Sequence, residues 1–290
     1  MAFTPYVGLT SPLALVVALV LRRWAVAALA ALVVGAFALA LLPRAIAGPQ
    51  PVVRDGVPLR VMTANLYLGR ADARTVVGLV ERRHVDVLAL EELTPEELRR
   101  LDAAGLRRLL PYRDADPRRT AAGTGLFARR PLRRLAQVNS LNVVAEPRAA
   151  LALPGGPVVE LGAVHPPAPV HGPVATWRHM LREIPGPDVT RPTLRLVLGD
   201  FNATLDHHDL RDLLGAGGYV DAGDAVGAGY DTTWPAGRRF PPEITIDHVL
   251  VDPRVAVRDV SVHLVPGSDH RAVIATLALP RAPRVRVRVD

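Results

Sequence analysis

The feature that most constrains this chain is an uninterrupted apolar stretch near its amino terminus. Residues 24–42, WAVAALAALVVGAFALALL, carry no charge in nineteen positions. At about 1.5 Å of rise per residue, a helix of this length crosses the hydrocarbon core of a bilayer. We therefore expect a transmembrane helix within a membrane part that comprises residues 1–43.

The preceding stretch, residues 5–21, is also uncharged but shorter. It fits either the second arm of a helical hairpin that turns at Arg22 and Arg23, or a membrane-associated lead-in. Because arginines beside an apolar span stay in the cytoplasm, we expect everything after residue 43 to lie outside. A cleaved signal peptide is the competing interpretation, since residues 45–47 (AIA) have the form of a cleavage site. The apolar region is long for a signal peptide, which favours an anchor in the cell membrane.

The rest of the chain has the pattern of a layered α/β domain. A Pro/Gly-rich linker at residues 44–58 precedes a domain expected at 59–280, and a basic tail follows at 281–290. Strands are expected at 59–64, 85–90, 123–129, 146–153, 158–164, 194–198, 246–251, 255–265 and 272–279. Helices are expected at 72–83, 94–110, 173–184 and 207–215. Because strands outnumber helices about two to one, we expect two sheets rather than one parallel sheet.

Two absences limit the chemistry. The chain has no cysteine, and all 35 of its basic residues are arginine. These absences exclude a disulfide framework, thiolate metal ligands, cysteine nucleophiles and lysine Schiff bases. A metal ion, if one is used, must be held by Asp, Glu, Asn or His.

The net charge of +7 lies mostly at the two ends. Residues 1–48 hold three arginines and no acid, and residues 281–290 hold four arginines and one acid, which leaves the remainder near +1. Within that remainder, residues 99–134 hold eleven arginines, whereas residues 200–231 hold seven aspartates. An arginine-rich surface beside an acidic loop region would suit a phosphorylated substrate near a metal. A solvated, arginine-rich helix explains the same pattern equally well.

Polar side chains interrupt the apolar runs where the expected strands end or begin. Because a strand end is rigid, such side chains can be held in a shared cleft. Taken singly, each also has an ordinary role, such as a carboxylate at a helix N-terminus or a structural histidine in a loop. The positions are Asn65, Glu91 with Glu92, His165, Asp200 with Asn202, Asp247 with His248, and Asp269 with His270.

The order of these residues resembles the endonuclease/exonuclease/phosphatase superfamily, which includes DNase I, sphingomyelinase and inositol polyphosphate phosphatases. The resemblance covers residues 59–279, and its motifs are TANL, ALEE, VHPP, GDFN, IDHV and SDHRAV. GDFN with a downstream SDH is the most diagnostic pair. The resemblance implies a four-layered α/β sandwich, with two β-sheets face to face and helices outside. A preceding membrane segment is similar to membrane-tethered bacterial members, including some associated with resistance to glycopeptide antibiotics.

Three positions depart from the family pattern. Glu91 stands where a glutamine is usual, which adds a carboxylate to the second motif. Val164 stands where a threonine often precedes the histidine, and His248 stands where many relatives have a tyrosine. These departures bear on metal affinity and on contacts with the substrate.

The resemblance implies a metal-dependent phosphoesterase that works outside the cytoplasm by in-line attack of water on a phosphate ester. Glu92 is then the principal carboxylate ligand, and Asn65 and Asp269 complete or orient the metal shell. The expected ion is Mg²⁺, and Mn²⁺ would bind the same ligands.

The resemblance also implies the catalytic roles. Asp200, and Asp247 together with His270, would activate the water. Asn202 would donate to the phosphoryl oxygens, and His165 would assist the same charge or the leaving group.

The substrate stays open among nucleic acid, a phospholipid head group and a lipid-linked phosphate. Only thirteen aromatic residues and a nearly neutral domain disfavour nucleic acid. The membrane segment favours a lipid-linked phosphate, and no protein partner is predicted. The alternatives are a catalytically inactive phosphate- or lipid-binding module on the same fold, and an unrelated α/β protein with accidental motifs.

Overall fold

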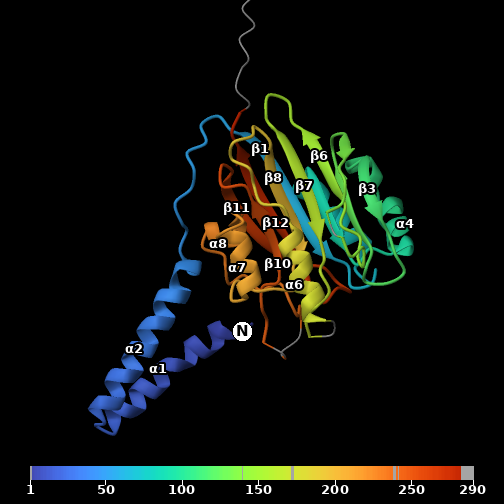
Figure 1. Ribbon diagram of the computed structural model, residues 1–290. Helices are drawn as coiled ribbons and strands as arrows, with labels where there is room; N and C mark the ends of the chain where they lie inside the picture. The colour runs from blue at the N-terminus through green and yellow to red at the C-terminus, as the bar shows by residue number, and fades with distance from the viewer. Residues whose placement is uncertain (1, 139, 171–172, 238–239, 241, 282–290) are drawn as a thin grey trace, which may run out of the picture.

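A computed structural model describes residues 2–281, apart from 139, 171–172, 238–239 and 241. Two six-stranded β-sheets pack face to face with helices on their outer faces, and a helical hairpin precedes them (Figure 1). The expected four-layered α/β sandwich is therefore confirmed.

Each sheet is mixed, with one parallel pair of strands at its centre. In the first sheet, β1 runs parallel to β2, and in the second, β7 runs parallel to β8. The first sheet has the order β11 (Ala256–Leu264), β12 (Arg271–Leu279), β1 (Val57–Asn65), β2 (Val87–Glu91), β4 (Thr124–Ala128) and β3 (Tyr112–Asp116). The second has the order β5 (Leu132–Arg134), β6 (Arg148–Ala152), β7 (Val158–Val164), β8 (Leu194–Asp200), β10 (Asp247–Val251) and β9 (Val220–Asp221).

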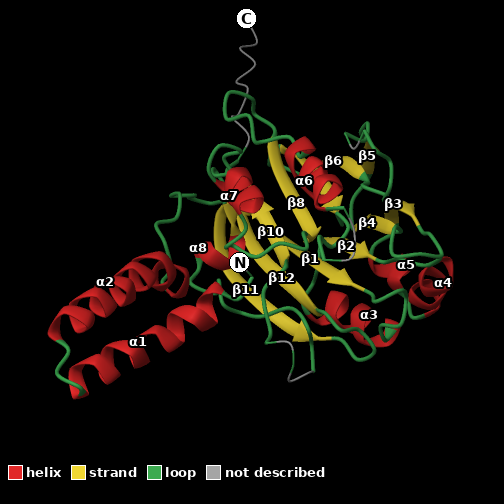
Figure 2. Cartoon of the chain, turned by 60° about the horizontal axis from the view of Figure 1, so that its bottom comes forward, coloured by secondary structure: helices red, strands yellow, loops and turns green. Residues whose placement is uncertain are grey.

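Helices cover the outer face of each sheet (Figure 2). The first sheet is covered by α3 (Ala73–Arg82), α4 (Pro95–Ala103) and α5 (Leu106–Leu109). The second is covered by α6 (Val174–Glu183) and α7 (His208–Leu214), and α8 (Ala222–Ala225) packs at its edge.

Strand β2 illustrates how the sequence builds these layers. Val87 and Ala89 face the core between the two sheets, whereas Leu88 and Leu90 face the helices. A strand buried on both faces reads as a continuous apolar run, and its side chains still alternate with period two. Glu91 therefore continues the inward face of Val87 and Ala89 and enters the interior between the sheets.

One expected helix is wrong in its extent. Residues 94–110 were expected to form a single helix, but α4 ends at Ala103 and α5 begins at Leu106. Gly105 between them has a φ of 108°, a left-handed conformation that ends a helix. The short strands β3, β5 and β9 were not expected, because β3 and β5 are largely exposed and lack an apolar run.

The amino-terminal stretch forms two antiparallel helices, α1 (Thr4–Val20) and α2 (Trp24–Leu41) (Figure 1). The turn between them lies at Arg22, whose φ is 54°. Among the described residues, the helical stretch Trp24–Ala45 is long and apolar enough to cross a membrane, and only 6% of its most apolar window is buried.

Gly199 lies near the carboxyl end of β8, where it pairs with Val164 of the neighbouring strand β7. Its φ is 151°, and a Cβ at this position would lie 1.9 Å from the carbonyl oxygen of Val164 on β7. Only glycine therefore lets β8 approach β7 this closely just before Asp200.

We expect Gly199→Ala to lower the free energy of unfolding by about 2 kcal/mol or more, because the contact is with backbone. Thermal unfolding in detergent measures the effect, which corresponds to a midpoint about 4–8 °C lower. Gly162→Ala on β7 is the matched control, because a Cβ there meets nothing closer than 3.9 Å. Equal midpoints for the two variants would contradict this account of Gly199.

Candidate active site

Six strand ends meet at one end of the sandwich. The two parallel pairs deliver Asn65 from β1, Glu91 from β2 and Asp200 from β8 at their carboxyl ends, with His165 directly after β7. Strands β10 and β12 run the other way and begin there, with Asp247 as the first residue of β10 and His270 directly before β12. Residues far apart in the sequence therefore converge because of sheet topology. We call this end of the sandwich the site end.

The side-chain amide of Asn65 links two carboxylates. Its Nδ2 donates to Asp200 Oδ2 at 3.0 Å and to Glu92 Oε1 at 3.3 Å. Its Oδ1 accepts from the backbone N–H of Tyr67 at 2.9 Å. Glu92 has a φ of 53°, and its Oε2 accepts from the backbone N–H of Leu68 at 2.8 Å. The amide thus presents its donor side to the carboxylates and holds them close together.

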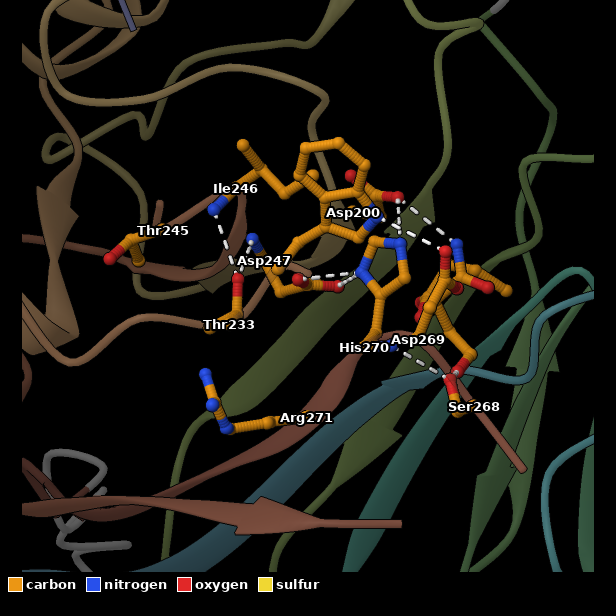
Figure 3. Close-up of polar contacts among 12 residues, drawn as sticks. Asp200, Thr233, Thr245, Ile246, Asp247, Ser268, Asp269, His270 and Arg271 are labelled. Carbon is orange, nitrogen blue, oxygen red and sulfur yellow. Dashed lines mark hydrogen bonds and ion pairs between the residues drawn. The ribbon is translucent and has the colours of Figure 1, made fainter. Parts of the chain in front are cut away.

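His270 lies between two aspartates (Figure 3). Its Nδ1 lies 2.9 Å from Asp247 Oδ2, and its Nε2 lies 3.7 Å from Asp200 Oδ2. Burial alone would lower the pKa of His270, but the carboxylates of Asp247 and then Asp200 outweigh it and raise this pKa to about 10. Burial, and next the charge of Asp247, raise the pKa of Asp200. The group is therefore an imidazolium between two buried carboxyl groups.

His165 and Asn202 flank Asp200. His165 Nε2 lies 3.6 Å from Asp200 Oδ2 and 3.9 Å from Glu92 Oε1, and its Nδ1 lies 3.0 Å from the carbonyl oxygen of Ala121. The backbone N–H of Asn202 donates to Asp200 Oδ1 at 2.8 Å, and its Nδ2 donates to the carbonyl of Pro166 at 3.0 Å. Both side chains are thus held at the rim of the carboxylate cluster.

Asp269 joins the cluster through an indole. Its Oδ2 accepts from Trp234 Nε1 at 3.2 Å, and the Trp234 ring lies beside that of His270, with centroids 6.5 Å apart. Its Oδ1 is buried and has no hydrogen-bond partner among the described residues. An unpaired buried carboxylate oxygen is a ready ligand for a cation.

Glu91 lies beneath this cluster, in the interior between the sheets. It is fully buried, and its Oε1 accepts from Thr63 Oγ1 at 2.9 Å. Burial, and next the nearby charge of Asp247, raise the pKa of Glu91 well above its usual range. The additional carboxylate that replaces the usual glutamine therefore faces inward rather than toward solvent.

His248 faces the opposite side of β10 from Asp247. Its Nδ1 lies 2.8 Å from Asp221 Oδ2, and its Nε2 lies 2.9 Å from the carbonyl oxygen of Ala203. Burial alone would lower the pKa of His248, but Asp221 outweighs it and raises this pKa. His248 therefore supports the segment after Asp200 from behind.

The donor set fits a hard divalent cation. The nearest ligand atoms of Asp200, Asp247 and His270 all lie within 4.8 Å of one another, and Glu92 lies on the other side of Asn65 from Asp200. Carboxylate oxygens are ligands that Mg²⁺ and Mn²⁺ prefer, and the Asn65 amide, which turns its N–H side toward them, orients Glu92 and Asp200. Several buried carboxylates with two histidines leave an excess of negative charge, which a bound cation would offset.

Sequence reasoning missed three residues that support the site. Thr233 Oγ1 accepts from the backbone N–H groups of Ile246 and Asp247 at 3.0 and 3.2 Å, which fixes the start of β10. Ser268 Oγ donates to the backbone carbonyl of Asn65 at 2.7 Å and accepts from His270 N at 3.0 Å. The third is Trp234. Its aromatic ring, within a loop rich in Gly and Pro, was the signal in the sequence that could have pointed to it.

The arginine-rich stretch at residues 99–134 is mostly neutralised within the protein. Seven of its eleven arginines form ion pairs with carboxylates, chiefly at the surface. The paired residues are Arg99, Arg100, Arg108, Arg113, Arg118, Arg129 and Arg134. A largely paired, solvated surface therefore describes this stretch better than a free cationic patch.

Comparison with known proteins identifies the fold. The model of the Endonuclease/Exonuclease/phosphatase family matches residues 62–270. A structure of D. rerio TDP2 complexed with single strand DNA product is 17% identical, with a TM-score of 0.59, covering 76% of this chain and 98% of that one. The endonuclease/exonuclease/phosphatase from Beutenbergia cavernae is 20% identical, with a TM-score of 0.53, covering 78% and 73%.

A third structure, the endonuclease/exonuclease/phosphatase from Bacteroides vulgatus, is 17% identical, with a TM-score of 0.53, covering 77% of this chain and 99% of that one. A search of curated proteins found no match. At these identities the solved structures show a shared fold, whereas the match of the family model spans the residues of the site.

The ionisation of His270 leads to a prediction for stability. Its pKa in the folded protein, about 10, exceeds the usual value of about 6.5. The stabilisation by this imidazolium is therefore complete below about pH 6.5 and is lost as the pH rises through about 10. In detergent with a chelator, we expect the free energy of unfolding to fall over this window, and to fall less in His270→Gln.

Denaturant unfolding at several pH values measures this difference. The chain has no lysine, but the pKa of His248 is also raised, so the difference between His270→Gln and the wild type, rather than the wild-type slope alone, reports on His270. His208→Gln is the control, because His208 is exposed on α7 and should leave the pH dependence as in the wild type. Equal slopes for His270→Gln and the wild type would contradict the charged state of His270.

Proposed function

We propose a function from the premise that this chain belongs to the endonuclease/exonuclease/phosphatase family and is a hydrolase acting on phosphate ester bonds. The proposed function is that of a membrane-anchored, metal-dependent phosphoesterase that acts outside the cytoplasm. The observation that carries it is the group of Asp200, Asp247 and His270, which lie together beside Asn65 and Glu92.

We assign the metal to Glu92 and Asp269, with Asn65 orienting the shell. The Glu92 side chain is 15% exposed, against 2% for Asp200, and Asp269 has an unpaired buried oxygen. A bound Mg²⁺ or Mn²⁺ would neutralise charge on the phosphoryl oxygens of the substrate and stabilise the leaving oxygen. Mg²⁺ is preferred because so few protein carboxylates are needed to hold it.

The remaining residues handle protons and position the phosphate. Asp247 fixes the orientation of His270 through Nδ1, which leaves Nε2 facing Asp200. We assign Asp200 to orient and deprotonate the attacking water, with His270 stabilising the negative charge that develops. Asn202 would donate to a phosphoryl oxygen in place of Pro166, and His165 would assist the same charge or the leaving group.

The anchor is assigned to residues 1–43, with the linker at 44–58, the catalytic domain at 59–280 and the basic tail at 281–290. The apolar stretch Trp24–Ala45 supports a membrane span, and the hairpin shape of α1 and α2 supports two membrane-embedded arms. The turn at Arg22 and Arg23 would lie on the cytoplasmic side, which places the active site outside.

For the substrate, we propose a lipid-linked phosphate or a phospholipid head group ahead of nucleic acid. The D. rerio TDP2 structure was solved with a single strand DNA product, so nucleic acid is the third candidate substrate. The chain has only thirteen aromatic residues, and most arginines of its basic stretch are already paired. Both features give little capacity to stack bases or to neutralise a long run of phosphates.

Asp200→Ala and His270→Ala should each lower kcat by about 10²- to 10⁴-fold while the protein stays folded, because both act on the reacting groups. The assay is release of nitrophenol from a generic phosphodiester and a monoester with Mg²⁺ or Mn²⁺, and circular dichroism checks the fold. Asp188→Ala is the matched control, because Asp188 lies in the loop before β8, at the opposite end of that strand from Asp200. Metal binding by a folded wild-type protein without any turnover would favour the inactive binding module.

Glu92→Gln should raise the Mg²⁺ concentration for half-maximal activity about tenfold or more, because it removes the principal charged ligand. Calorimetric titration with Mn²⁺ provides a reading independent of turnover. Glu96→Gln is the control, since Glu96 is exposed on α4 and pairs with Arg99. Unchanged Mn²⁺ affinity in Glu92→Gln would move the metal assignment from Glu92 to the carboxylates of Asp200 and Asp247.

A further inference from the structure

The residues between the helical hairpin and the domain are bonded to the domain rather than forming a free linker. Arg44 Nη2 lies 2.9 Å from Asp206 Oδ1, and both side chains are largely buried. The backbone N–H of Gly229 donates to the carbonyl of Arg44 at 3.1 Å, and the hydroxyl of Tyr230 donates to the carbonyl of Leu41 at 2.7 Å. The end of α2 is therefore fastened to the catalytic domain.

A second set of contacts holds the next part of the chain. Gln50 Nε2 donates to the carbonyl of Ala225 at 2.8 Å, and its Oε1 accepts from the backbone N–H of Val257 at 3.0 Å. Gly48 N donates to the same Ala225 carbonyl at 3.1 Å. Residues 41–50, which we call the docked segment, are thus bonded to α8, to β11 and to two loops.

The hairpin meets the domain at the site end. Asp206 lies shortly after Asp200 at the end of β8, and Tyr230 lies in the loop that leads toward β10. The first helix touches the same loop, because the hydroxyl of Tyr6 donates to the carbonyl of Glu243 at 2.6 Å. Figures 1 and 2 both show the hairpin leaving the domain on this side, next to the N-terminus.

The most exposed large hydrophobic side chains of the described domain residues lie at the same end, although Val189, in the loop before β8, is also 60% exposed. Among the described residues from 57 onward, the three most exposed large hydrophobic side chains are Phe240, Val170 and Leu264, at 83%, 80% and 63%. Phe240 lies in the loop closed by the bridge between Trp234 and Ile244. Val170 follows β7, and Leu264 pairs with Arg271, the residue after His270.

We propose that the catalytic domain rests with its active site against the bilayer surface, fixed there by the docked segment. Phe240, Val170 and Leu264 would then contact the interfacial region of the lipid. We take the bilayer as the partner of this face because the face is continuous with the apolar hairpin. The hairpin would enter the membrane beside the same loops. This inference rests on the proposed membrane anchor, and it selects phosphate groups presented at a lipid surface as substrates.

The absence of cysteine provides a direct experiment. Single cysteines at Phe240, Val170 and Leu264 carry an environment-sensitive fluorophore, and the full chain is reconstituted in phosphatidylcholine vesicles containing brominated lipid. Leu32→Cys in α2 reports anchoring. The matched far-end controls are Tyr112→Cys and Val158→Cys, which lie at the starts of β3 and β7.

We expect bromine quenching at the site-end positions to exceed that at the far-end controls by about twofold or more, because only the former reach the interfacial depth. Equal quenching at the two ends, with Leu32→Cys quenched, would overturn this inference and leave the anchor intact. An unquenched Leu32→Cys would overturn the anchor, and this inference with it.

A second variant tests the docked segment itself. Arg44→Ala combined with Gln50→Ala removes the ion pair with Asp206 and the two hydrogen bonds of the Gln50 side-chain amide. Neither substitution changes a residue of the active site. Quenching at Phe240→Cys should fall to the far-end value while Leu32→Cys stays quenched. Turnover of a vesicle-borne phosphate ester should fall several-fold, whereas turnover of soluble nitrophenyl phosphate stays unchanged. Unaltered quenching at Phe240→Cys would show that the docked segment does not set the orientation.

Discussion

The crowding of carboxyl groups at one end of the sandwich is the constraint on which the rest of the structure depends. Two parallel strand pairs, one in each sheet, carry acids at their carboxyl ends, and the antiparallel strands β10 and β12 bring Asp247 and His270 to meet them. Such charge is costly to bury without compensation. His270 between Asp200 and Asp247, and Asn65 between Asp200 and Glu92, supply part of that compensation, and the unpaired oxygen of Asp269 leaves room for a cation.

The sequence carried enough information to predict the architecture and the strand ends whose polar side chains meet in the candidate site. Apolar strands that end in Asn65 or Asp200 can be recognised in the sequence, because a period-two pattern depends only on neighbouring residues. The break at Gly105 was not visible, since a glycine inside an amphipathic run is compatible with a continuous helix. Thr233 and Ser268 were missed for a different reason. Their contacts join segments far apart in the chain, and nothing in the local pattern shows which backbone groups they meet.

Two departures from the family pattern, Glu91 and His248, differ in the direction that their side chains face. Glu91 continues the inward face of β2 and lies beneath the site, with a raised pKa caused first by burial. His248 faces outward on β10 and bridges Asp221 and the carbonyl of Ala203. Neither residue replaces a group that we assign to the chemistry. Both instead stand behind Asp200 and Asp247, so they bear on how firmly those aspartates are held.

The position of the hairpin has a practical consequence for handling the protein. Because α1 begins beside the loop that carries Glu243, a purification tag or fusion partner added before the first residue would emerge next to the site end of the sandwich. Strand β12, in contrast, runs from Arg271, next to His270, to Leu279 at the opposite end of the sandwich. Affinity handles, fluorescent proteins and surface-immobilisation chemistry therefore belong at the carboxyl terminus, where they leave the loops at the site end unobstructed.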